Sequence, residues 1–175
     1  TVCPNMPLRG LFYICELYKR IKDEKRLYST TLIKIPTPHY IVFYNGTDNT
    51  EDIITQRLSD AFLNRDRESC IEVTATLINV NYGHNKELMK SCRTLQDYSY
   101  FISRIRYHMG KLENKDDKEA KFAAVSTAID ECIKQNVLAD FLKNHRAEVT
   151  NMSIFEYDEE EAKQVFKEDG RIEGI

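Results

Sequence analysis

The acidic residues that follow the first long apolar run are the first candidates for chemistry. Asp48, Glu51 and Asp52 come after a run of β-branched and aromatic residues at positions 39–44. Carboxylates that converge at the end of a strand can hold a divalent cation, which activates water for hydrolysis. Because nothing in this segment enforces a ligand spacing, the interpretation we favour is a solvated loop after an Asn-Gly turn.

The histidines and cysteines are further candidate ligands, but they do not form a complete site. His39 and His84 flank two predicted strands and could act as a base or as a ligand, but no third partner can be named. The 5 cysteines form no CxxC pair, so we expect reduced thiols in a cytoplasmic protein and no zinc site. The motifs GxGxxG, GxSxG and HExxH, which mark common nucleotide-binding and hydrolytic enzymes, are absent from the sequence.

Cations at helical spacing are the candidates for contacts with DNA. They form two sets, Lys86, Lys90 and Arg93, then Arg104, His108 and Lys111. Within each set the residues are three or four positions apart, so they share one helix face. The formal net charge is −3, from 25 Lys and Arg against 28 Asp and Glu. Since DNA-binding domains are usually basic, we expect only weak contact with DNA, and a solvated helix face is the competing interpretation.

The N-terminal part of the chain predicts an α/β arrangement that would position these groups. Apolar residues at three- and four-residue steps predict an amphipathic helix over 7–23. Two β-branched runs, at 39–44 and 70–81, predict strands that pair, and the first is apolar enough to be buried on both faces. The segment 53–62 is ambiguous: it suits a short helix, or a helix followed by an edge strand at 58–62.

The C-terminal part predicts helices alone. A helical period runs from Lys86 to Lys111, as one helix or as two with a break at Arg93-Thr94, where threonine can cap a new helix. A charged hinge at 113–121 is the best candidate for a domain boundary. Beyond it, helices are predicted at 122–137, 138–149 and 158–167. No apolar run reaches the roughly 18 residues of a bilayer-spanning helix, so no membrane partner is expected.

Several segments, taken in their order, resemble one known family. They are Asn5-Met6-Pro7-Leu8-Arg9 leading into Leu11-Phe12-Tyr13, the strand and turn at 35–46, Leu58-Ser59-Asp60-Ala61-Phe62, Asn79-Val80-Asn81, Ala139-Asp140-Phe141-Leu142 through Arg146-Ala147-Glu148-Val149, and Ile154-Phe155-Glu156-Tyr157-Asp158. Together they look like the Rpn-type family of recombination-promoting nucleases and putative transposases, and they cover nearly the whole chain. The resemblance implies a PD-(D/E)XK nuclease fold, in which a central sheet flanked by helices presents acidic residues to a divalent metal.

The same resemblance places the catalytic residues of the family outside this chain. In the family, the Asp and the Glu-x-Gln or Glu-x-Lys pair lie on strands that precede the Asn-Met-Pro-Leu-Arg helix, so no catalytic residue is carried over. Arg9, Tyr13 and Asn45 would border that site. The implied architecture is a partial restriction-endonuclease-like α/β region at 1–112, with a core sheet flanked by helices, followed by an all-α C-terminal extension at 113–175.

Two functions are compatible with this resemblance. In the first, the chain is the C-terminal part of a metal-dependent DNA endonuclease linked to recombination or transposition, catalytically incomplete as given, with Mg²⁺ expected for the complete family member and no cofactor in this chain. In the second, it is a non-catalytic association module that pairs through a sheet edge or its C-terminal helices. The expected partners are DNA, contacted weakly, and a second copy or another subunit.

Overall fold

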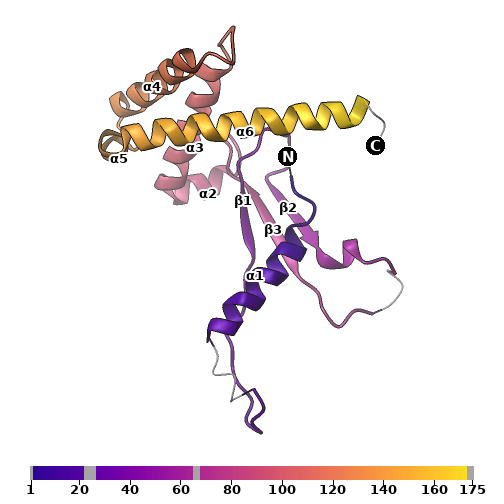
Figure 1. Ribbon diagram of the computed structural model, residues 1–175. Helices are drawn as coiled ribbons and strands as arrows, with labels where there is room; N and C mark the ends of the chain where they lie inside the picture. Colours follow the sequence, from indigo (N-terminus) through magenta and orange to yellow (C-terminus); the bar gives the residue numbers. More distant parts are fainter. Residues whose placement is uncertain (1, 22–26, 65–67, 173–175) are drawn as a thin grey trace. The chain divides into compact units, whose positions relative to one another are not determined.

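The chain forms two compact units, Thr1–Val80 and Asn81–Ile175, and each is described by itself. The computed structural model describes residues 2–21, 27–64 and 68–172, with the backbone alone for residues 21 and 160–172. The division falls after residue 80, whereas the sequence predicted a boundary after residue 112. The helices on both sides of the charged hinge share one apolar core, which is why the division does not fall there. Figure 1 shows the elements of both units.

Unit 1 is a small α/β unit built on a sheet that has three strands in the described residues. Its elements are α1 (Met6–Ile21), β1 (Ile41–Tyr44), β2 (Ile53–Arg57), the 3-10 helix η2 (Leu58–Ala61) and β3 (Thr74–Asn79). The strand order is β1-β3-β2, with β1 parallel and β2 antiparallel to β3. The predicted helix, the two predicted strands and their pairing are confirmed.

The prediction for residues 53–62 is wrong in the order of its elements. The structure places a strand first and a turn of 3-10 helix after it. Ile53, Ile54 and Thr55 stand opposite residues 76–78 of β3. These β-branched side chains suit a pleated, half-buried surface, so pairing with β3 prevails over the weak helical pattern.

The two faces of this sheet differ in exposure. Because side chains alternate along a strand, Tyr44 and Leu77 lie on one face, where both are buried. Ile41 and Phe43 lie on the other face and are 54% and 61% exposed. The predicted burial of this strand on both faces is therefore wrong, since within unit 1 the described residues cover one face only.

α1 packs against β2 and β3. Gly10 lies so close to the ring of Tyr40 that an added Cβ would come within 2.5 Å of the ring, so this approach requires glycine. The buried positions of the helix include Pro7 and Gly10, whereas the large apolar residues Leu8 and Phe12 are exposed. A second apolar face of α1 is thus left open within unit 1.

Unit 2 is helical throughout. Its helices are α2 (Lys86–Ser91), α3 (Arg93–Met109), α4 (Lys118–Lys134), α5 (Ala139–Asn144) and α6 (Arg146–Ile172). The alternative of two helices between Lys86 and Lys111 is confirmed, with the break at Cys92. A separate helix at 158–167 is wrong, because α6 continues through that segment. Within the residues that the structure describes, no helix is long and apolar enough to cross a membrane.

The core of unit 2 lies between α3 and α4. Ile105 and Met109 of α3 pack in one cluster with Val125 and Ile129 of α4, and Leu142 of α5 joins them. Burying an aliphatic side chain of this size contributes about 1.5–3 kcal/mol, so this cluster dominates the stability of the unit. A charged pair adds to it, because the buried Lys121 Nζ of α4 lies 2.5 Å from an Asp158 carboxylate oxygen of α6.

The cysteines are free thiols in the structure, and their surroundings differ. Cys15, Cys70 and Cys92 are exposed, whereas Cys132 belongs to the core between α3 and α4. Burial away from water disfavours the thiolate and raises the pKa of Cys132 to about 11. Cys132 therefore acts as a small apolar residue of the core.

Candidate functional site

The loop that leads into α2 is held in a defined conformation. Gly83 has a φ of +96° and Asn85 a φ of 42°, two left-handed positions that turn the chain from Asn81 into the helix. The guanidinium of Arg106, on α3, donates a hydrogen bond of 2.7 Å to the side-chain oxygen of Asn81. The loop is therefore anchored to α3, with Tyr82 between these fixed points.

Tyr82 presents an aromatic surface beside this anchor. Its side chain is 60% exposed, and its ring meets the ring of Tyr100 edge to face at a centroid distance of 5.5 Å. An edge-to-face contact fixes the orientation of the Tyr82 ring. An aromatic ring that is held in place and still accessible can stack on a planar ligand.

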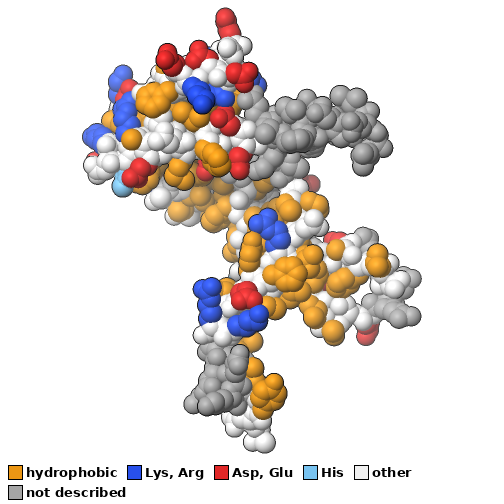
Figure 2. All heavy atoms as spheres, in the orientation of Figure 1, with side chains coloured by type: hydrophobic (Ala, Val, Ile, Leu, Met, Phe, Trp, Pro, Cys, Tyr) orange, Lys and Arg blue, Asp and Glu red, His pale blue; other side chains and the backbone are white. Residues whose placement is uncertain are grey.

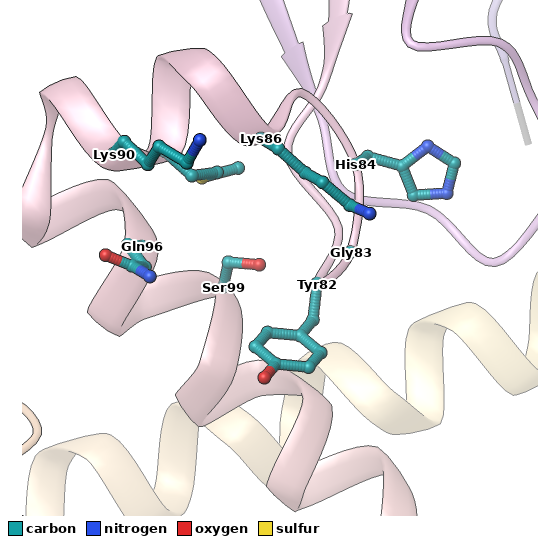
Figure 3. A pocket seen from close by; sticks show the side chains of 8 residues that line it. Tyr82, Gly83, His84, Lys86, Lys90, Gln96 and Ser99 are labelled. Carbon is teal, nitrogen blue, oxygen red and sulfur yellow. The ribbon is translucent and has the colours of Figure 1, made fainter.

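The structure brings the first predicted set of cations around Tyr82. Lys86 and Lys90 line a pocket of about 390 Å³ with Tyr82 (Figure 3). Lys90 and Arg93 line a second pocket of about 390 Å³ that also includes Tyr82. The three cations predicted from helical spacing thus border two hollows that share one aromatic residue.

Acidic neighbours partly balance these cations. The Lys90 ammonium lies 2.7 Å from the carboxylate of Glu87, and the Arg93 guanidinium 3.7 Å from that of Asp97. The cationic side chains of both pairs are well exposed, so each ion pair contributes little to stability. Another anion can therefore replace the carboxylate at little cost. We refer to Tyr82 with Lys86, Lys90 and Arg93 as the patch around Tyr82. Its three cations outnumber the two neighbouring anions, Glu87 and Asp97, by one.

The second predicted set makes contacts inside unit 2. Arg104 on α3 forms an ion pair of 2.8 Å with Glu131 on α4, and His108 approaches the same carboxylate at 3.1 Å. Lys111 lies over the ring of Tyr107, 4.0 Å from its centroid. These side chains link α3 to α4 or cover the surface of α3, so they do not extend the patch around Tyr82.

The residues predicted to border a catalytic site lie in unit 1. The Arg9 guanidinium donates a hydrogen bond of 3.1 Å to the Tyr13 hydroxyl, and the Tyr13 ring meets that of Tyr40 edge to face at 6.4 Å. Arg9 and Tyr13 are exposed. Asn45, half-buried, follows the last residue of β1. The structure brings Arg9 and Tyr13 together.

Among the carboxylates after β1, that of Asp48 closes a loop. The Asp48 carboxylate accepts a hydrogen bond of 3.1 Å from the backbone N–H of Val2, and the backbone N–H of Asp48 donates one of 3.0 Å to the Tyr44 hydroxyl. In the described residues no group of three or more His, Cys, Asp or Glu side chains could hold a metal ion.

Sequence reasoning missed a buried serine on α3. Ser99 is 4% exposed, lines the pocket beside Tyr82, and its hydroxyl has no hydrogen-bond partner within the described structure. The available signal was its position: Ser99 lies four residues after Leu95 and three before Ile102, on the apolar face of a predicted helix. A polar residue on the apolar face of a helix indicates a buried group that needs a hydrogen-bond partner.

No protein-family model, no curated protein and no solved structure matches the chain. The chemistry of the patch around Tyr82 therefore follows from its own residues and their geometry.

The Glu131 carboxylate gives a prediction for the stability of unit 2. The hydrogen bonds from Arg104 and then His108 lower the pKa of Glu131. A lowered pKa in the folded state stabilises the protein above the unfolded-state pKa, and this contribution is lost as the pH falls through the folded-state pKa. We expect Glu131→Gln to lower the free energy of unfolding by about 1 kcal/mol near neutral pH, with no difference from the wild type in strong acid.

Urea unfolding followed by circular dichroism across the acidic range measures this effect. Glu113→Gln, which changes an exposed carboxylate in the loop before α4, is the control and should match the wild type throughout. A Glu131→Gln deficit that stays the same in strong acid would contradict an electrostatic origin.

Proposed function

We propose that this chain is the DNA-contacting, catalytically incomplete C-terminal part of a PD-(D/E)XK nuclease-like protein of the Rpn type. The observation that carries the proposal is the meeting of Lys86, Lys90 and Arg93 around the accessible ring of Tyr82. Cations bind phosphates regardless of sequence, and an aromatic ring stacks on any base. The order of the resembling segments and the mixed α/β structure of unit 1 support the same assignment.

The weakness of the expected contact follows from the local charges. Glu87 and Asp97 compete with phosphate for Lys90 and Arg93, and the chain as a whole is acidic. The patch thus suits a supporting contact with the DNA backbone, which positions the duplex and carries no sequence information. Affinity should depend steeply on salt, because each neutralised phosphate releases a counterion.

The triple variant Lys86→Ala, Lys90→Ala, Arg93→Ala tests the contact with DNA. Fluorescence anisotropy of a labelled duplex, titrated at two salt concentrations, gives the affinity and its salt slope. We expect the variant to bind more weakly, and its salt slope to fall by about 1 for each phosphate contact that is lost.

A matched control separates the patch from the loss of charge. Lys118→Ala, Lys134→Ala, Lys143→Ala removes three exposed cations from other helices of unit 2. It should keep the wild-type affinity and slope. Equal behaviour of the two triple variants would refute a DNA contact at the patch.

A second prediction concerns cleavage by this chain alone. Hydrolysis of a phosphodiester needs converging acidic ligands, and Asp48 instead closes a loop through Val2. Incubated with supercoiled plasmid and Mg²⁺ or Mn²⁺, the purified chain should leave the plasmid intact on an agarose gel. Nicking that Asp48→Asn or Asp52→Asn abolishes would overturn this assignment.

An association module is the second candidate function, and the open face of the sheet favours it. Ile41, Phe43 and Ile53 share that face and are all more than half exposed. Apolar side chains also lie at the surface over α1, on the side of unit 1 that Figure 2 shows. In the described residues β1 pairs on one side only, so a second copy of the chain could add to both the face and the edge.

Phe43→Lys tests this second function. A cation in the middle of an apolar interface would have to be buried, so we expect the variant to self-associate less than the wild type at tens of micromolar protein, as measured by light scattering. Leu63→Lys is the control, since Leu63 is a fully exposed apolar residue away from the strands. A wild type that is already a monomer at this concentration would contradict pairing through the sheet.

A further inference from the structure

Ser99 on α3 carries a buried hydroxyl that has no hydrogen-bond partner among the described residues. The residue is 4% exposed. A buried hydroxyl without a partner destabilises the fold, and most serines inside helices avoid this by bonding to a carbonyl of the preceding turn. Ser103 on the same helix does so, donating to the Tyr100 carbonyl at 2.6 Å. The contrast leaves the Ser99 hydroxyl available to a partner other than the described residues.

The pocket that Ser99 lines has room for such a partner. Its volume is about 390 Å³, within the range of small-molecule sites. In Figure 3 the Ser99 hydroxyl points toward the space between α3 and the loop that carries Tyr82, and the Lys86 side chain extends toward that loop, with its ammonium on the side of His84. Lys86 and Ser99 both line the pocket. The pocket thus joins a buried hydroxyl, an aromatic ring and a cation.

The lining chemistry is that of a site for a nucleotide. Met89 and the Tyr82 ring offer apolar surface to a planar base. Ser99 and Gln96 can each donate and accept hydrogen bonds, as the edge of a base requires. Lys86 and Lys90 line the same pocket, and their ammonium groups are the kind that pairs with a phosphate. Inorganic phosphate alone would leave the apolar surface and the buried hydroxyl unused.

We propose that this pocket receives one unstacked nucleotide, with its base against Tyr82 and hydrogen-bonded to Ser99, and its phosphate near Lys86 and Lys90. The proposal rests on the proposed contact with DNA and deepens it: a nucleotide at the end of a single strand, or one lifted out of a duplex, is the substrate class that the pocket selects. A free mononucleotide carries the same chemistry, and the experiment separates the two sources.

Ser99→Ala is the deciding variant, because its two effects have opposite sign. Alanine removes an unpartnered buried hydroxyl and has higher helix propensity, so the melting temperature should stay the same or rise. Binding of single-stranded oligoadenylate, measured by anisotropy, should weaken roughly three- to tenfold through loss of one hydrogen bond. Ser103→Ala, the control on the same helix, should leave that binding unchanged. Tyr82→Ala is a second variant, for use if Ser99→Ala proves hard to purify, because Tyr82 is exposed. It should also weaken the binding of oligoadenylate, through loss of base stacking.

The probes and variants keep this inference apart from the proposed function. Single-strand affinity that neither Ser99→Ala nor Tyr82→Ala lowers would overturn the pocket, whatever the triple Lys86, Lys90 and Arg93 variant does to duplex binding. Conversely, a duplex affinity that the triple variant leaves unchanged would refute the proposed contact with the duplex. Weaker dAMP binding by Ser99→Ala would still support the nucleotide pocket in that case. Tighter binding of the strand than of dAMP identifies DNA as the source, whereas equal binding identifies the free nucleotide.

Discussion

The packing of α3 against α4 is the constraint on which the helical unit depends. Ile105 and Met109 fix one side of α3 in the core with Val125 and Ile129. With α3 fixed, Arg106 can hold the Asn81 side chain, and the loop that carries Tyr82 acquires its place. Every group of the candidate site is attached to α2, to α3 or to this loop, so the apolar core sets the geometry of the polar site.

The same helix explains why identical spacing has different outcomes for the two sets of cations. Arg104 lies on the side of α3 that meets α4, where Glu131 neutralises it. Arg93 lies in the first turn of α3, and its partner Asp97 lies on the same helix. The Arg93 side chain is exposed. A helical period identifies residues on one face, but the neighbouring helix decides whether that face is a surface or an interface.

Much of the fold could be predicted from the sequence, because its local signals were strong. Proline and apolar spacing define α1, and β-branched runs define β1 and β3. The rest depends on contacts between segments far apart in the chain. Residues 53–57 form a strand because β3 lies alongside them, and the acidic Asp158 belongs to a long helix in which it meets the buried Lys121 of α4. The site was predicted as cations alone, since neither the accessibility of Tyr82 nor the missing partner of Ser99 can be read from residue order.

The unequal cysteines have a consequence for the behaviour of the chain in air. At neutral pH the thiol of Cys132 is protonated and enclosed, so oxidants reach it last. Cys15 and Cys70 are exposed in unit 1, and Cys92 is exposed in unit 2. Slow oxidation would therefore join separate molecules by surface disulfides while each helical core stays intact. Covalent oligomers formed in this way would mimic a specific assembly, and a reducing agent is what distinguishes the two.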